Sequence, residues 1–243
     1  MRVNSSHKNP WSDKDVEQHW DRVASIYVDE NDKVKAAHDQ RFIESMKHLN
    51  LFDNCRVLNV TSRDCEANEY ILKSEAGAKV VNAEISAGLI KVAQAIRPYV
   101  NQVKLDTYSK LPFENGEFNR VLSLETLEHV SDPVAFLKEL HRVSTPDARL
   151  VLSCPPATSE IPYRIFTFLF GGHGEGPHRF LSSKEVKSLF QDTGWKLIFH
   201  KGTVLLPVGP DKLQRAAEKF LDKFQGTFIA EQGIRQFFVC VKQ

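Results

Sequence analysis

Glycine is absent from a stretch of this sequence where a nucleotide-binding protein would carry several. Residues 56–72 read RVLNVTSRDCEANEYIL, which has the outline of a strand, a loop and a helix. In α/β enzymes a nucleotide is held at such a place, and glycines there let the backbone close on the ligand. The stretch is therefore either a nucleotide site built without glycine or no such site at all.

The sequence also lacks the charge excess, the apolar runs and the paired cysteines that mark other classes of protein. Its 32 basic and 31 acidic residues nearly cancel, which argues against a nucleic-acid or anionic-membrane footprint. No apolar run is long enough to span a membrane, and the N-terminal residues have no apolar core of the secretory kind. The four cysteines form no C-x-x-C pair, as expected for reduced thiols. We expect a cytosolic protein.

Alternating short apolar runs and amphipathic stretches dominate the rest of the chain. Residues 13–51 show helical spacing, and then the period changes. Buried strands are predicted at 56–60, 78–85, 101–106, 118–125 and 148–154, and helices between them at 66–74, 87–97 and 132–143. Strand and helix in this alternation predict a doubly wound, Rossmann-like α/β fold with a mostly parallel sheet.

The rhythm breaks after Cys154. A long insertion at 155–180 precedes a helix, and two further strands at 195–202 and 235–243 flank a helix near 212–224. This ending leaves no ordinary helical crossover, so we expect about seven strands with an antiparallel edge strand. The predicted division is an N-terminal helical cap at 1–51 and one domain at 52–243, with a lid at 155–180.

Three features gather at the carboxyl ends of consecutive predicted strands. They are the loop 61–65, Glu84 and Asp106. Ligands of open α/β sheets bind at this edge, where a carboxylate can accept ribose hydroxyls or an adenine amino group. Each acid alone is more readily a solvated strand end or helix cap, but together they favour a nucleoside site.

Ordered motifs in the second half carry a family resemblance. They read LPF at 111–113, FN at 118–119, LEH at 127–129 and HRF at 178–180. From about residue 56 to 195 the chain resembles the class I S-adenosylmethionine-dependent methyltransferases, particularly the branch of ubiquinone and menaquinone biosynthesis enzymes. The resemblance implies S-adenosylmethionine as cofactor and a small-molecule acceptor.

The chain departs from this family at the first motif. Asn59 stands where the family has an acid, and Thr61, Arg63 and Cys65 stand where it has glycines. The side chains either fill the space of the cofactor's methionine end, or Arg63 pairs with the cofactor carboxylate. A third alternative is a surface ion pair of Arg63 with Asp64 or Glu66, and we favour the pairing with the cofactor.

The resemblance also implies roles for single residues. Glu84 would bind the ribose hydroxyls, Ile85 would pack on the adenine, and Asp106 with Thr107 beside it would take the adenine amino group. The residues that the resemblance implies on the methionine side of the cofactor are Leu124, Glu125, Asn59, Thr61 and Arg63. Tyr27 matches a tyrosine that closes over the cofactor in relatives.

The acceptor side is less defined by the sequence. His129 is our first candidate for a general base, with packing beside the next helix as the alternative. The insertion supplies Tyr163, His173 and His178 as candidate acceptor contacts. Two histidines with Glu175 among glycines make a weak ligand set, and methyl transfer requires no metal, so none is expected.

Three functions are compatible with these features. The first is a small-molecule methyltransferase, active as a monomer or homodimer. The second is a non-catalytic descendant that keeps the fold as a binding or assembly module. A nicotinamide oxidoreductase comes third, because its fingerprint also depends on the absent glycines.

Overall fold

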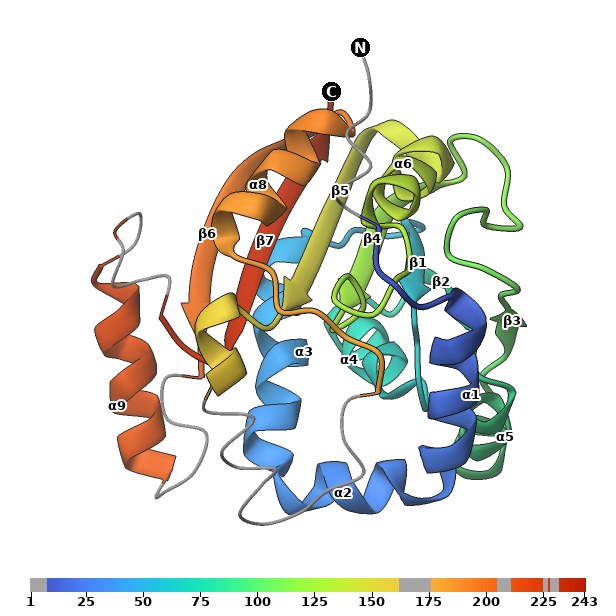
Figure 1. Cartoon of the computed structure of the whole chain (residues 1–243), viewed down its shortest axis with the longest axis horizontal. Coiled ribbons are helices and arrows are strands. Elements are labelled where there is room, and N and C mark those ends of the chain that lie inside the picture. The colour runs from blue at the N-terminus through green and yellow to red at the C-terminus, as the bar shows by residue number, and fades with distance from the viewer. Residues whose placement is uncertain (1–7, 162–175, 205–210, 225–226, 228–231) are drawn as a thin grey trace.

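A seven-stranded sheet forms the centre of the molecule (Figure 1). This computed structural model describes residues 8–161, 176–204, 211–224, 227 and 232–243. The strands are β1 (Arg56–Val60), β2 (Lys79–Glu84), β3 (Gln102–Lys104), β4 (Phe118–Leu124), β5 (Ser144–Cys154), β6 (Trp195–Thr203) and β7 (Arg235–Lys242). Their order across the sheet is β3-β2-β1-β4-β5-β7-β6.

The pairing confirms a mostly parallel sheet with an antiparallel edge. The five strands from β3 to β5 in that order are all joined by parallel pairings. β7 runs antiparallel to both β5 and β6, so the antiparallel pairings lie at one side of the sheet. The strand order reverses between β1 and β4, which places the expected ligand crevice beyond the ends of these two strands.

Helices cover both faces because alternate residues of the central strands are apolar on both sides. Leu58 and Val121 point into one core, whereas Val57 and Leu122 point into the other. The helices are α1 (Asp13–Val23), α2 (Tyr27–Lys33), α3 (Lys35–Leu49), α4 (Glu66–Ser74), α5 (Ala87–Ile96), α6 (Pro133–Val143), α8 (Ser183–Asp192) and α9 (Asp211–Asp222), with 3₁₀ turns at Ala24–Ile26 and Ala157–Ser159. Residues of α1, α5, α6 and α8 join the first core, and residues of α3 and α4 join the second.

α1 and α2 lie at the carboxyl ends of the strands (Figure 1), whereas α3 packs on the second face of the sheet. α1 is fixed there by two carboxylates. Asp13 accepts hydrogen bonds from the Tyr108 N–H at 2.8 Å and the Ser131 hydroxyl at 2.7 Å. Asp21 accepts from the Gly88 N–H at 2.8 Å, at the start of α5. α1 and α2 therefore cover the edge where a ligand is expected, while the cap at 1–51 as a separate unit stays a prediction.

No helix among the described residues is long and apolar enough to cross a membrane. Most of the predicted lid, residues 162–175, lies outside the described part of the chain. Its two flanks meet, since Pro156 and Leu181 form an isolated parallel bridge.

Candidate active site

The loop between β1 and α4 has the left-handed backbone conformation of a glycine-rich loop but contains no glycine. The φ angles are +58° at Thr61, +51° at Arg63 and +65° at Cys65. These are the three positions at which the family resemblance predicts glycine. A left-handed backbone costs an ordinary L-residue roughly 1–2 kcal/mol, so surrounding contacts must hold this path.

Hydrogen bonds on both sides of the loop supply that restraint. The Ser62 N–H donates to the Ala83 carbonyl at 2.9 Å, and the Cys65 N–H donates to the Ser62 carbonyl at 2.7 Å. Gln102, on β3, donates to the Arg63 carbonyl at 2.7 Å. The loop is thus tied to β2, which ends at Glu84, and to β3, which is followed by Asp106.

Glu84 is fully buried and is occupied by backbone donors. One carboxylate oxygen accepts the Arg63 N–H at 2.8 Å, and the other accepts from Ile85 at 2.8 Å and Ser86 at 2.9 Å. An ionised carboxylate offers about four acceptor positions, so about one is left. In this conformation Glu84 organises the loop more than it presents itself to a ligand.

The Arg63 side chain turns inward and fills the space above the loop. Its guanidinium lies 3.7 Å from the ring centroid of Trp20, on α1, and donates to the Glu125 carbonyl at 3.4 Å. Asp64 pairs instead with Arg97 at 3.0 Å, and Glu66 binds His38 at 2.8 Å. The alternative of a surface ion pair for Arg63 is therefore wrong: the side chain is only 7% exposed.

The space left beside Arg63 is small and is lined by two arginines. A cavity of about 20 Å³, room for about one water, is bordered by Arg41, Asn59, Thr61, Ser62, Arg63, Asp64 and Leu124, among other residues. Nη1 of Arg63 and Nε of Arg41 are buried and have no hydrogen-bond partner among the described residues. Buried donors of this kind are costly to leave unpaired, which is a reason to expect an acceptor group there.

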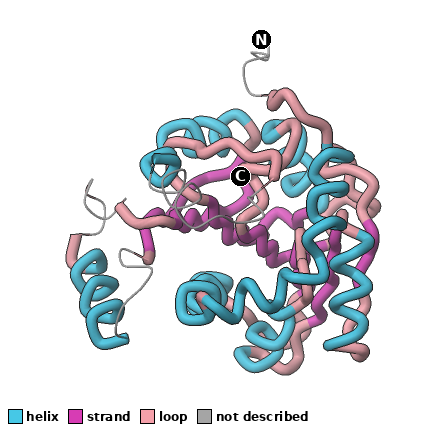
Figure 2. The backbone as a smooth tube through the Cα atoms, turned by 60° about the horizontal axis from the view of Figure 1, so that its bottom comes forward, coloured by secondary structure: helices cyan, strands magenta, loops and turns pink. Residues whose placement is uncertain are grey.

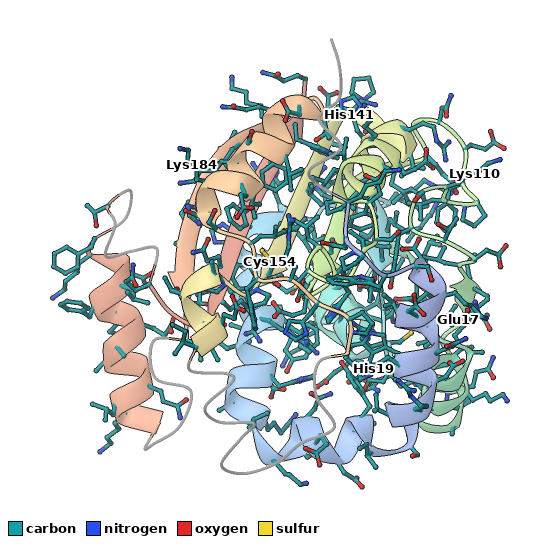
Figure 3. The ribbon with its side chains drawn as sticks, in the orientation of Figure 1. Glu17, His19, Lys110, His141, Cys154 and Lys184 are labelled. Atoms are coloured by element: carbon teal, nitrogen blue, oxygen red, sulfur yellow. The ribbon has the colours of Figure 1, made fainter. Side chains whose placement is uncertain are left out.

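A further buried arginine lies on the other side of Glu125. Glu125 follows β4 with a φ of +50°, and its carboxylate accepts from Arg235 Nε at 3.0 Å and from the Ser153 hydroxyl at 2.6 Å. Burial lowers the pKa of Arg235, and the neighbouring Glu125 opposes that shift. Figure 3 labels Cys154 at the end of β5 and His19 on α1.

The structure brings several predicted cofactor residues to this edge. Asn59 is buried and donates to Asn82 at 2.8 Å. Leu124 is buried against the small cavity, and Ile85 is fully buried beside Glu84. Tyr27 is buried, and its hydroxyl accepts from Arg41 at 3.3 Å.

Two predicted adenine contacts lie at the rim. Asp106 is exposed after β3, and its side chain forms no hydrogen bond with another described residue. The Thr107 hydroxyl donates to Asp13 at 2.6 Å, so it is already engaged in holding α1. Their place agrees with a binding edge, while their roles stay predictions.

His129 is buried in a cluster of aromatic and cationic groups. Its Nδ1 lies 2.9 Å from the Pro177 carbonyl, which assigns the proton to Nδ1 in the neutral ring. Its ring meets Trp20 edge-on at 5.5 Å, and the His178 ring lies 6.4 Å away. Burial, together with the charge of Arg63, lowers the pKa of His129 to about 3. A base role for this residue requires a more hydrated site than the present one.

The remaining acceptor candidates are only partly covered by the structure. Tyr163 and His173 lie outside the described residues, as does Glu175. His178 is placed, and its Nδ1 lies 2.8 Å from the Gly176 carbonyl. Within the described part of the chain, His38, Asp39 and Glu66 bring ligand atoms within 4.8 Å of one another, but Lys35 already pairs with both carboxylates.

Sequence reasoning missed the residues that reach this edge from distant elements. They are Asp13, Trp20, Asp21, Arg41 and Arg235. Trp20 lies at an ordinary apolar position of an amphipathic helix, and nothing in its spacing points to a stacking partner. Arg235 gives the one weak signal, because it is a charged residue at the start of an otherwise apolar strand.

Comparison with known proteins agrees with this geometry. Residues 65–152 match the model of a methyltransferase domain. This stretch of the chain is similar to the methyltransferase domain family. S-adenosylmethionine is the cofactor expected of that family.

Curated relatives share part of the chain. A demethylmenaquinone methyltransferase of Beutenbergia cavernae is 29% identical over 65% of this chain and 63% of its own length. A ubiquinone biosynthesis O-methyltransferase of Ruegeria pomeroyi is 27% identical over 54% of this chain and 57% of its own. The chain thus matches less than two thirds of the length of these relatives.

Solved structures share the fold at low sequence identity. An S-adenosylmethionine-dependent methyltransferase of Thermotoga maritima has a TM-score of 0.67 at 16% identity, covering 93% of this chain and 99% of its own. The cyclase SpnF has a TM-score of 0.68 at 13% identity, covering 96% and 97%. A cyclase among the neighbours shows that the fold alone does not fix the reaction.

The donor set of this edge fits S-adenosylmethionine, whereas the closed cavity does not hold it. Glu84 and Asp106 can accept hydrogen bonds from adenosine, and Arg41 and Arg63 can donate to a carboxylate. Ligand pockets usually measure about 300–1,000 Å³, far above the 20 Å³ found beside Arg63. Binding therefore requires Arg63 and Trp20 to move apart.

Proposed function

We propose that this protein transfers a methyl group from S-adenosylmethionine to a small-molecule acceptor. The observation that carries the proposal is the left-handed backbone at Thr61, Arg63 and Cys65. A loop free of function would relax to a cheaper path or take residues suited to it. Strain retained at three alternate positions, and held by Glu84, is typical of a binding loop.

Adenosine recognition falls to Glu84 and Asp106 in this proposal. Glu84 has about one acceptor position left beside its three backbone bonds. Binding both ribose hydroxyls would release one of these bonds, and the bond to the Arg63 N–H belongs to the loop that must move. Cofactor binding and loop opening are thereby coupled through one carboxylate.

The methionine end would be held by Arg63 and Arg41. Each guanidinium has a buried N–H without a described partner, and each lines the small cavity. A carboxylate would satisfy both donors and neutralise part of the cationic cluster. Arg63 thus takes over with its side chain what bare backbone does in a glycine loop, at some cost in affinity.

The bound cofactor supplies an electrophilic methyl group, and the chain supplies position. Alignment accounts for most of the acceleration expected in such a transfer. The acceptor would enter on the side of Glu125, His129 and His178. In the closed state an imidazolium at His129 is disfavoured, so a proton-accepting role belongs to the opened site, with Arg63 drawn away. The names of the curated relatives support a small aromatic acceptor of the quinone kind.

The closed cavity favours a second candidate, a non-catalytic binding module. Calorimetric titration with S-adenosylmethionine, S-adenosylhomocysteine and adenosine separates the two. We expect all three to bind, and methyl transfer to a quinol-type acceptor to follow. If none of the three ligands gives heat of binding or a thermal shift, the methyltransferase proposal is wrong and the binding module is the remaining candidate.

A further inference from the structure

Helix α9 stands apart from the body of the molecule (Figures 1 and 2). One of its faces is fixed inward: Leu221 is buried, and Glu218 accepts a hydrogen bond from the Val204 N–H at 2.6 Å. Asp222 accepts from Lys201 at 2.7 Å, and Lys201 in turn pairs with Glu44 at 3.0 Å. The body thus engages both acidic side chains described on this helix.

An apolar stripe runs along an outward face of the same helix. Leu213 is 55% exposed and Phe220 is 47% exposed. A separation of seven residues places them two turns apart on one side. Phe224, four residues further on and half-buried, lies 4.8 Å from Phe220 between ring centroids and extends the stripe.

A row of lysines borders this stripe. Lys212, Lys219 and Lys223 are all exposed, and each directly precedes one residue of the stripe. Lys212 and Lys219 therefore lie about 100° around the helix from the stripe, and Lys223 lies in the turn that follows α9. None of the three lysines forms an ion pair with another described residue. The chain's net charge of +1 hides this local excess, because it averages over the whole molecule.

We propose that α9 docks on the surface of an anionic lipid bilayer. Apolar side chains at one depth, with lysines along one border, fit a plane of acyl chains beneath phosphate head groups. The charge of the exposed helix is complementary to such a surface, since its described acids face the body. The helix would lie in the interface without spanning it, and no described helix is suited to span.

The place of α9 adds a geometric reason. It connects β6 to β7, and β7 begins at Arg235, next to the pair of Cys154 with Gln236. The helix therefore projects from the edge of the sheet that carries the candidate site. Docking through α9 would bring that edge towards the bilayer, whatever reaction the site performs.

Co-sedimentation of the full chain with vesicles tests the proposal without any cofactor. We expect binding to phosphatidylcholine vesicles that contain phosphatidylglycerol, weak binding to phosphatidylcholine alone, and loss of binding at high salt. Combined Lys212→Glu, Lys219→Glu and Lys223→Glu should weaken binding by about 100-fold or more. The matched control reverses three exposed lysines elsewhere, Lys138, Lys184 and Lys196, and should bind nearly as the natural chain does.

A fluorescent reporter distinguishes a membrane from an acidic protein partner. All four cysteines are buried, so Leu213→Cys can be labelled selectively with a polarity-sensitive dye, and Leu72→Cys on α4 serves as control. Anionic vesicles should shift the emission at 213 to the blue and leave 72 unchanged. Equal shifts at both positions, unchanged binding of the α9 charge-reversed variant, or a response at 213 to polyglutamate but not to vesicles would overturn the proposal.

Discussion

The two halves of the candidate site are built differently. On the side proposed for adenosine, Glu84 is embedded in backbone hydrogen bonds and Ile85 is fully buried beside it. On the side proposed for the methionine end, Arg41, Arg63 and Arg235 surround Glu125, and Trp20 lies over Arg63. One half is a cradle of backbone hydrogen bonds around Glu84, whereas the other is a set of charged side chains. Cofactor binding should therefore keep most of the first half in place and rearrange the second.

The same contrast appears in how the chain uses left-handed backbone. Beyond the site, Asn50 and Asn54 hold φ angles of +51° and +60°, and asparagine tolerates this region comparatively well. Within the loop the same region is held by Thr61, Arg63 and Cys65. Thr61 is the costliest of these, because β-branched residues rarely adopt a positive φ. The loop thus keeps a left-handed backbone at residues whose side chains disfavour it.

The largest effect should follow from breaking the cradle. Glu84→Gln replaces one acceptor oxygen with a donor that faces backbone N–H groups. At least one buried N–H then loses its partner, and we expect a loss of about 3 kcal/mol in the free energy of unfolding. Urea denaturation measures it.

Asp106→Asn is the matched control, because Asp106 is exposed on the neighbouring strand end. Its free energy of unfolding should change by less than about 0.5 kcal/mol. A Glu84→Gln protein as stable as this control would show that the carboxylate is not what holds the loop.

On the methionine side the expected effect is on affinity. Arg63→Gln should weaken S-adenosylmethionine by about 1.5–3 kcal/mol, the range for a charged hydrogen bond, and leave adenosine nearly unchanged. Calorimetry on both ligands reads the difference. Arg97→Gln, at a neighbouring arginine already paired with Asp64 and Glu69, is the control. Tighter binding of S-adenosylmethionine by the Arg63 variant would mean that the side chain merely obstructs the site.

The two sides of the site also differ in how much of them the sequence could predict. The strands and the adenosine-side acids were predictable, because buried parallel strands leave continuous apolar runs and the acids sit at their ends. Glu84 is the last residue of β2, and Asp106 lies two residues after β3. The partners of the methionine side come from α1, α3 and β7, so only tertiary packing brings Trp20, Arg41 and Arg235 together. No local spacing encodes such contacts. The inward turn of Arg63 could not be chosen over a surface ion pair for the same reason.

The pH dependence of the free energy of unfolding should report on His129, which lies beside Arg63 and Trp20. The pKa of His129 is lowered to about 3 in the folded state, from an ordinary value near 6.5. Between these values the unfolded chain binds the proton that the folded chain excludes, so stability falls as pH falls. One such group contributes up to about 1.4 kcal/mol per pH unit.

Denaturation at pH 6 and pH 5 checks this expectation. His129→Gln should flatten the slope, and Arg63→Gln should flatten it in part by removing the nearby positive charge. His48→Gln, at a half-buried histidine on α3, is the control. An unchanged slope in the His129 variant would place the proton uptake on another group.

The smallest effect isolates the strain of the loop itself. Thr61→Ala and Thr61→Gly both remove the hydroxyl and the methyl group, so the difference between them reflects mainly the backbone. At a φ of +58° alanine keeps the steric penalty and glycine loses it, so glycine should be more stable by about 1 kcal/mol. In a helix the order is reversed, and Ala95→Gly, at an exposed position of α5, should cost about 0.5–1 kcal/mol. Thermal or urea unfolding of the three variants gives both differences. If alanine proves equal to or better than glycine at position 61, the left-handed path is not a feature of the folded protein in solution, and the central observation for a cofactor loop is lost.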